Sequence, residues 1–212
     1  MRSRHTTPPT SPGRPGRPRS AAADTAILEA TRTALVELGW SKLSLSDVAA
    51  RAGVAKTTLY RRWAGKSELV VDAVAVLFDE LELPDRGSLA ADVEGVVHQF
   101  AAILERPEAK TALMAVVAES TRDAPLRERI RTSIVDRQKR LVLEGRARAQ
   151  ARGELPPGVG APESGTDDLI FDVIAGAVVH RALVSGEPVD AEWVRRFTAL
   201  LLGGLGAAAD GA

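Results

Sequence analysis

The stretch LSLSDVAARAGVAKTTLYRRWAGKSELV, residues 43–70, decides the fold of the N-terminal third of this chain. Apolar residues recur at helical spacing on both sides of Gly53, which predicts two short helices, at 45–52 and 55–62. A glycine can adopt the positive φ that a tight turn between them needs. Their small shared core would come from Val48, Ala49, Ala52, Val54 and Leu59. This layout predicts a helix-turn-helix, whose second helix enters the major groove of DNA.

The polar side chains of the second helix suit a nucleic-acid partner. The segment RAGVAKTTLYRRWAGK, residues 51–66, contains no acidic residue. Four side chains in the exposed first turns of the helix are candidates for base contacts: Lys56, Thr57, Thr58 and Arg61. Lysine and arginine can bind guanine edges, and threonine methyl groups can contact thymine. Either threonine could instead be solvated helix surface.

At these residues the chain resembles the TetR-type (tetracycline-repressor, AcrR-like) family of helix-turn-helix transcriptional regulators. The matching positions are Ser44, Asp47-Val48-Ala49, Ala52-Gly53-Val54, Thr58-Leu59-Tyr60, Trp63, Lys66 and Leu69. The resemblance implies a DNA-binding domain followed by a helical ligand-binding and dimerisation domain. It also implies phosphate contacts by Tyr60 and Lys66, which Ser44 would join at the N-terminus of its helix. Tyr60 could alternatively be a partly buried core residue.

Two positions depart from the family pattern. Ala55 stands where the family usually has serine or threonine, so a capping hydroxyl worth ~1 kcal/mol and one phosphate contact are missing. Trp63 replaces the commoner phenylalanine and enlarges the apolar plug between 55–62 and the next helix. Neither departure changes the assignment.

The formal net charge of zero hides an asymmetry along the chain. Residues 1–66 carry twelve Lys and Arg against four Asp and Glu, whereas residues 67–212 carry sixteen against twenty-four. A basic first third on an acidic body predicts a polyanionic partner for that third. Composition can also drift along a chain without functional meaning.

Residues 1–20 are expected to form a disordered basic arm, because they hold five prolines and five arginines and almost no apolar side chain. Within the arm, GRPGRPR at 13–19 resembles the Arg-Gly-Arg-Pro element of minor-groove AT-hooks, with the order Gly-Arg-Pro repeated. Arg14, Arg17 and Arg19 are therefore candidates for contacts in a narrow A·T minor groove. A nonspecific solubilising tail is the alternative.

Apolar residues at spacings of three and four predict an all-α fold of about nine helices. Besides the two above, helices are expected at 21–38, 66–81, 88–105, 107–120, 124–152, 166–185 and 190–206. We expect residues 21–66 to form the DNA-binding domain and 67–212 the effector-binding and dimerisation domain. The helices at 166–185 and 190–206 are rich in apolar and small residues, which favours a homodimer through this pair. A fully internal helix pair is the alternative.

By the family pattern, the helices from 66–81 to 124–152 enclose an effector cavity. Inward candidates are Phe100, Leu104, Met114, Val117, Phe171 and His180, together with Val96 and Leu113. They predict an apolar or amphipathic effector, although any of them could simply fill the core. An effector that prefers mis-spaced recognition helices would release a pseudo-palindromic operator, with 66–81 as the lever. A repressor is favoured because the family is mostly repressive.

Other functional classes find little support in the composition. The chain has no cysteine and three scattered histidines, so we expect no metal, no cofactor and no enzymatic activity. The longest apolar run, VIAGAVV, is far below the ~18 residues that span a bilayer, so we expect a cytoplasmic, nucleoid-associated protein without a membrane partner. A helical protein–protein adaptor is the remaining rival. The uncompensated charge of Arg61, Arg62 and Lys66 argues against it.

Overall fold

The computed structural model describes residues 19–155 and 165–210, and within these ranges the chain is helical and has no β-strand. The elements are α1 (Arg19–Lys42), α2 (Leu45–Arg51), α3 (Lys56–Tyr60), α4 (Lys66–Phe78), α5 (Leu89–Glu105), α6 (Pro107–Ser120), α7 (Ala124–Ile130), η1 (Arg131–Val135), α8 (Asp136–Ala151), α9 (Thr166–Val179), η3 (His180–Ser185) and α10 (Ala191–Asp210). The two η segments are π-helical. Helices α7, η1 and α8 follow one another without a break, as do α9 and η3, so the described ranges contain nine continuous helices. The predicted all-α fold is confirmed.

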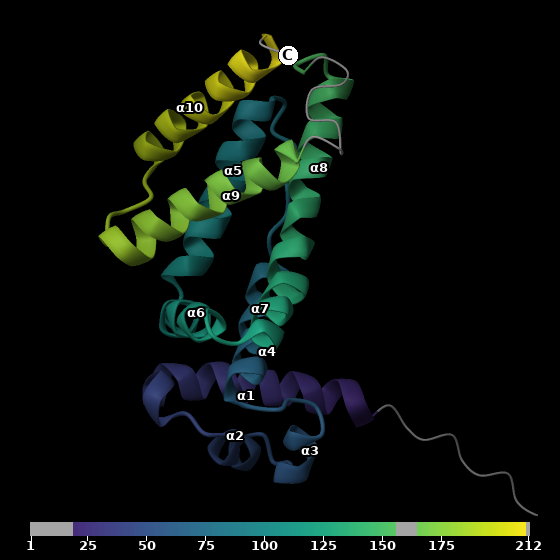
Figure 1. The fold of residues 1–212 in the computed structure, drawn as a ribbon, viewed down its shortest axis with the longest axis vertical. Coiled ribbons are helices and arrows are strands. Elements are labelled where there is room, and N and C mark those ends of the chain that lie inside the picture. Colours follow the sequence, from purple (N-terminus) through teal and green to yellow (C-terminus); the bar gives the residue numbers. More distant parts are fainter. Residues whose placement is uncertain (1–18, 156–164, 211–212) are drawn as a thin grey trace, which may run out of the picture.

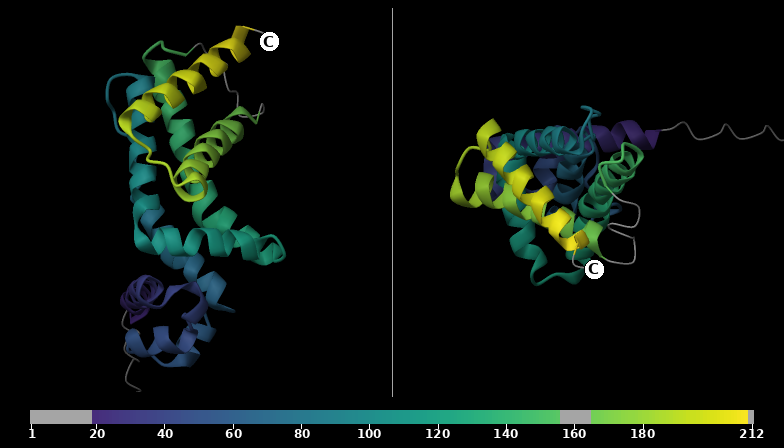
Figure 2. Two further views of the ribbon diagram at one scale, coloured as in Figure 1. Left: turned by 90° about the vertical axis from the view of Figure 1, so that its left-hand side faces the viewer. Right: turned by 90° about the horizontal axis from the view of Figure 1, so that it is seen from above.

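The helices form two groups that α4 connects (Figure 1). Helices α1, α2 and α3 lie together at one end of an elongated molecule, and the C-terminal end of the chain lies at the other (Figures 1 and 2). Helix α1 packs against both α4 and α6, so the N-terminal group of helices is in direct contact with the larger group. Helices α9 and α10 both pack against α5, far from the helix-turn-helix.

Local signals set the ends of the N-terminal helices. Ser44 caps α2, because its Oγ accepts a hydrogen bond from the backbone N–H of Asp47 at 3.2 Å. Gly53 turns the chain from α2 into α3 with a φ of 65°. Gly39 has a φ of 71° and interrupts α1, and one more helical turn follows it to Lys42. The predicted helix end at 38 is therefore a kink within α1.

Other boundaries also differ from the sequence prediction. Helix α3 is shorter than 55–62, and α4 ends at Phe78 rather than near 81. The single helix expected at 124–152 consists of α7, η1 and α8 in direct succession. A π-helical turn takes up extra residues, and the spacing of apolar residues does not reveal such a local change.

A single apolar core runs from the helix-turn-helix into the larger group of helices. Val48, Ala49 and Leu59 are buried as predicted, and they pack in one cluster with Ile27 and Leu35 of α1. The core continues along α4, whose buried residues include Leu69, Val70, Val71, Ala73, Val74, Leu77 and Phe78. The core packing along α4 therefore connects the helix-turn-helix with the larger group of helices.

Candidate DNA-binding surface and effector cavity

The recognition helix α3 is anchored by apolar side chains and presents polar ones outward. Leu59 is fully buried, and Trp63, which follows the helix, is 5% exposed. Four of the predicted contact residues on this segment have exposed side chains: Lys56, Thr57, Tyr60 and Arg61. The side chain of Thr58 is half-buried. Tyr60 is 57% exposed, so its ring lies on the surface rather than in the core. The structure thus brings five predicted contact residues together on one short helix and the turn after it.

The two helices of the motif begin differently. At α2, the Ser44 hydroxyl also donates to Asp47 Oδ2 at 2.5 Å, which holds the capping side chain in place. At α3, the N-cap residue is Ala55, whose methyl group cannot accept a hydrogen bond from the helix. Its backbone carbonyl accepts the N–H of Thr58 at 2.9 Å and starts the helix instead. The short length of α3 agrees with this weak N-cap.

Lys66, a predicted phosphate ligand, has a second set of contacts inside the protein. Its Nζ donates to the backbone carbonyl of Trp40 at 3.0 Å and lies 4.4 Å from the centre of the Trp40 ring. A cation over an indole face is attracted by the negative potential of the ring. Lys66 therefore joins the start of α4 to the end of α1, and any phosphate contact would be made by an ammonium already held in place.

The charge of Arg62 is compensated, which corrects the sequence interpretation. Arg62 forms an ion pair with Asp24 of α1. The two residues are far apart in the sequence and carry no periodic signal, so only the packing of α1 against the motif brings them together. The case against a non-DNA-binding adaptor therefore rests on the exposed Arg61 and Lys56 and not on Arg62.

The arginines of the N-terminal arm fall largely outside the described structure. Arg14 and Arg17 lie outside the described residues, and Arg19 is the first residue of α1. The proposed minor-groove contact of this arm therefore stays a prediction from the sequence.

A cavity of about 140 Å³ lies among the helices of the larger group. Its lining comes from the C-terminal end of α4, from α5, η1, α8, α9 and α10, and from the segments 81–83 and 155. The lining residues are Phe78, Leu81, Leu83, Leu89, Val93, Val96, Phe100, Ile134, Gln138, Leu141, Val142, Gly145, Arg146, Leu155, Thr166, Ile170, Phe171, Ile174, Ala175, Leu201 and Leu202. These side chains are overwhelmingly apolar, and the cavity suits an apolar body.

The structure brings two of the six candidate pocket residues to this cavity. Phe100 and Phe171 line it, as does Val96. The other four lie elsewhere. Leu104 is fully buried in the core, Met114 and Val117 of α6 are 44% and 42% exposed, and His180 is exposed with its Nδ1 3.3 Å from Ser185 Oγ. Among the described lining residues none belongs to α6, so the expected contribution of α6 is wrong. Helix α9 contributes through Phe171 as expected, and α10 contributes in addition.

The sequence prediction included the helix at 124–152 in the cavity wall but named none of the residues that α8 contributes. Ile134, Gln138, Leu141 and Gly145 follow one another at helical spacing, and this stripe was available as a signal. Gln138 is buried, and its Nε2 donates to the Phe78 carbonyl at 2.9 Å. This bond ties α8 to the last residue of α4 at the cavity wall.

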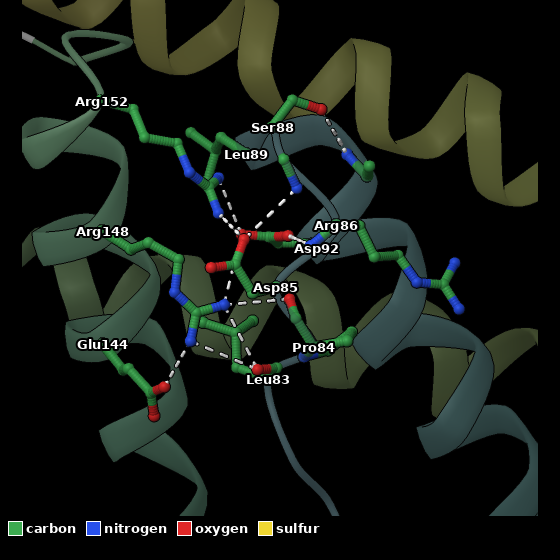
Figure 3. Close-up of polar contacts among 12 residues, drawn as sticks. Leu83, Pro84, Asp85, Arg86, Ser88, Leu89, Asp92, Glu144, Arg148 and Arg152 are labelled. Atoms are coloured by element: carbon green, nitrogen blue, oxygen red, sulfur yellow. Dashed lines mark hydrogen bonds and ion pairs between the residues drawn. The ribbon is translucent and has the colours of Figure 1, made fainter.

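A buried carboxylate, that of Asp92, joins α5 to the segment before it and to the C-terminal end of α8 (Figure 3). Asp92 of α5 accepts hydrogen bonds from the Arg86 backbone N–H at 2.6 Å and from Arg152 Nη1 at 3.0 Å, and Arg148 Nη1 lies 3.4 Å away. Arg148 also donates to the carbonyls of Leu83 and Pro84. Burial by itself raises the pKa of Asp92, but the hydrogen bonds from Arg86 and Arg152 and the two arginine charges outweigh it, so this pKa lies below the ordinary range.

The described residues offer no candidate for a metal site or a membrane-spanning helix. Within the described part of the chain, no three His, Cys, Asp or Glu side chains are grouped as a metal ion would require. Over the same residues, no helix has both the length and the apolar character needed to cross a bilayer.

Comparison with known proteins now identifies the family. Residues 27–73 match the family described as "Bacterial regulatory proteins, tetR family", and residues 83–201 match "Tetracyclin repressor-like, C-terminal domain". The chain is 29% identical to the HTH-type transcriptional regulator YdeS of Bacillus subtilis over 85% of its length and 88% of that protein. It is 31% identical to the DNA-binding transcriptional repressor TetR of Mycobacteroides abscessus, over 85% and 90% of the two chains.

A solved structure agrees with these relatives. The crystal structure of the TetR family transcription regulator SCO0332 superposes with a TM-score of 0.70 at 29% identity and covers 85% of this chain and 97% of its own. The matches extend over both the helix-turn-helix and the larger helical group. The chain belongs to the TetR family of helix-turn-helix transcriptional regulators.

Proposed function

We propose that this regulator is a homodimeric repressor that leaves a pseudo-palindromic operator when a small apolar or amphipathic effector occupies its cavity, and that it has no enzymatic activity. The observation that carries the proposal is the position of α4. Its first residue, Lys66, follows the recognition helix, and its last residue, Phe78, lines the cavity. An effector in the cavity therefore touches the helix that continues from the DNA-reading motif.

Release from DNA follows from linkage. A ligand shifts the equilibrium between two domain arrangements only by the difference in its affinity for them. An occupant that pushes Phe78 favours the arrangement in which α4 has moved, and α4 then changes the spacing of the two recognition helices. The Mycobacteroides abscessus relative is named as a transcriptional repressor, and this similarity supports repression over activation.

We propose that α9 with η3 and α10 form the dimer interface. Large apolar side chains stand exposed on these elements at Leu169, Val173, Val184 and Leu200. A second copy that covers them would remove this apolar surface from water. Operator binding would place the dimer in the cytoplasm, on the nucleoid. The expected domain division, between residues 66 and 67, falls in the first turn of α4. This position agrees with the proposed role of α4 as the helix that connects the two domains.

The proposal is tested by selecting genomic fragments that the purified protein binds and then measuring their affinity against salt concentration. Base reading by α3 requires one preferred sequence, with an affinity that falls as salt rises. Lys56→Ala or Thr57→Ala is expected to change the preferred sequence. Lys110→Ala is the control, because it removes a lysine from α6, outside the helix-turn-helix, and should leave the preferred sequence unchanged. Equal binding to all fragments, or no binding, would refute operator recognition.

The arm is tested separately, because it lies outside the described structure. We propose that Arg14, Arg17 and Arg19 contact the minor groove beside the operator half-sites. Replacing all three by alanine is expected to weaken binding to operators with A·T-rich flanks more than to operators with G·C-rich flanks. An equal loss on both would leave the arm as a nonspecific basic tail.

A further inference from the structure

An ion pair stands at the wall of the otherwise apolar cavity. Arg146 of α8, which lines the cavity, donates from Nη1 to Oδ2 of Asp167 in α9 at 2.6 Å. The two side chains are 16% and 13% exposed. Asp167 is preceded by Thr166 and followed one turn later by Ile170 and Phe171, and these three residues line the cavity as well.

Of the pair, Arg146 offers donors for a further hydrogen bond in the cavity. A guanidinium carries five N–H donors, and the bond to Asp167 uses one of them. Asp167 Oδ1 is buried and accepts no hydrogen bond from the described residues. Asp167 is not among the residues that line the cavity, so an occupant meets the guanidinium of Arg146 and not this oxygen.

The charge of the pair selects between kinds of polar head. Arg146 and Asp167 together are neutral, and a neutral head leaves this balance undisturbed. An anionic head would compete with Asp167 for Arg146 and would place a second negative charge beside a buried carboxylate. A cationic head would create the opposite conflict with Arg146.

We propose that the effector is a neutral amphipathic molecule whose polar head, such as the hydroxyl of a phenol, accepts a hydrogen bond from Arg146. This inference rests on the proposed function, since it takes the cavity as the effector site. The apolar body fills the space among Phe78, Phe100 and Phe171. An apolar cavity of about 150 Å³ takes up benzene, so a body of one ring or a short chain matches the observed volume of about 140 Å³.

Three probes with one apolar body separate the cavity from the head group: propylbenzene, 4-propylphenol and 4-propylbenzoate, titrated at neutral pH by calorimetry. We expect 4-propylphenol to bind roughly fivefold more tightly than propylbenzene, the factor of one net hydrogen bond, and more tightly than 4-propylbenzoate. Tightest binding by the benzoate, or equal binding of phenol and propylbenzene, would overturn the assigned head group. The cavity would still be the proposed effector site. If none of the three bound, the cavity itself would lose its proposed function.

Variants of the pair test its role directly. The double substitution Arg146→Met with Asp167→Leu removes both charges, and it should bring the phenol-to-propylbenzene ratio to about one while propylbenzene still binds. The single substitution Asp167→Asn preserves the shape of the side chain and leaves Arg146 unbalanced, so the preference should turn toward 4-propylbenzoate. This second variant keeps the test decisive where the first does not fold.

A neighbouring ion pair provides the matched control. Lys139 of α8 and Asp168 of α9 join the same two helices, with Nζ 2.7 Å from Oδ1, and neither residue is among those that line the cavity. Lys139→Met with Asp168→Leu should keep the wild-type preference for 4-propylphenol. A loss as large as that of the Arg146 and Asp167 variant would show that the preference comes from the α8–α9 packing, and the proposal would fail.

Discussion

Trp63 Nε1 donates a hydrogen bond to Asp72 Oδ2 over 2.8 Å, and the same carboxylate binds Arg129 of α7. Arg129 donates from Nε to Oδ1 at 2.9 Å and from Nη2 to Oδ2 at 2.6 Å, a two-bond arrangement that is stronger than a single contact. One carboxylate of α4 thus joins the residue that anchors the recognition helix to a helix of the effector domain.

We predict that Asp72→Ala lowers the free energy of unfolding by about 3 kcal/mol, because it leaves a buried indole N–H and a largely buried guanidinium without their shared acceptor. Denaturant titration measures this loss. Asp79→Ala is the matched control, since Asp79 stands directly after α4 and pairs with Arg137 of α8 at 2.9 Å but in a more exposed position. Its expected cost is under about 1 kcal/mol, and an equal cost in both variants would contradict the assigned role of Asp72.

Gly95 of α5 allows the segment before α5 to pack closely on that helix. A Cβ atom at this position would lie 2.5 Å from Cγ of Pro84. We predict that Gly95→Ala displaces this segment and lowers the free energy of unfolding by about 1–3 kcal/mol. Pro84→Ala removes the obstructing atom, so the double variant should recover most of the loss. Additive losses in a double-mutant cycle would show that the two residues do not interact.

Asp92 makes stability depend on pH in a defined direction. Its pKa in the folded protein lies below the value of ~3.9 that an unfolded aspartate has. Its contribution is therefore complete above about pH 5 and is lost as the pH falls through the folded pKa. We predict that Asp92→Asn costs about 3 kcal/mol at pH 6 and that the difference from wild type shrinks below about pH 4.

The matched control for this measurement is Asp85→Asn. Asp85 contacts the same arginine, Arg152, but its side chain is mostly exposed. We expect its replacement to cost under about 1 kcal/mol, because an exposed ion pair contributes little to stability. A difference between wild type and Asp92→Asn that stayed constant from pH 6 to pH 3 would contradict the assigned pKa direction.

The helix-turn-helix could be predicted from the sequence because its determinants are local. The capping residue Ser44, the turn at Gly53 and the buried Leu59 lie within sixteen residues of one another, and the structure agrees with the prediction at each. The pairing of Arg62 with Asp24 could not be predicted, because it depends on the angle at which α1 packs against the motif.

The cavity could be predicted only in part, for the same physical reason. Phe100 and Leu104 are one turn apart on α5, yet the first lines the cavity and the second is buried in the core. Which side of a helix meets a cavity depends on partners distant in the sequence, here Phe78 of α4 and Leu201 of α10. Arg146 was missed because a charged residue beside an apolar stripe normally indicates a solvated edge of the helix.

The proposed dimer face gives a prediction about the oligomeric state. Leu200 of α10 is 77% exposed, so Leu200→Glu removes little packing within one chain. We expect the variant to remain folded and its dimer to dissociate at least tenfold more readily, because a charge would have to enter an apolar interface. Light scattering at micromolar concentration measures this. Leu143→Glu on α8 is the control, and a dimer that tolerates Leu200→Glu would rule out this face.

Lys66 is the residue at which DNA binding and internal structure meet, and its two roles can be separated. If Lys66 contacts a phosphate, Lys66→Met weakens binding to all DNA sequences similarly and reduces the slope of log affinity against log salt by about one. Trp40→Leu removes the ring below the ammonium but keeps the backbone carbonyl that Lys66 binds. We therefore expect Trp40→Leu to lower stability and to leave the salt slope unchanged. An unchanged slope in Lys66→Met would mean that Lys66 has only a structural role, in which it joins the start of α4 to the end of α1.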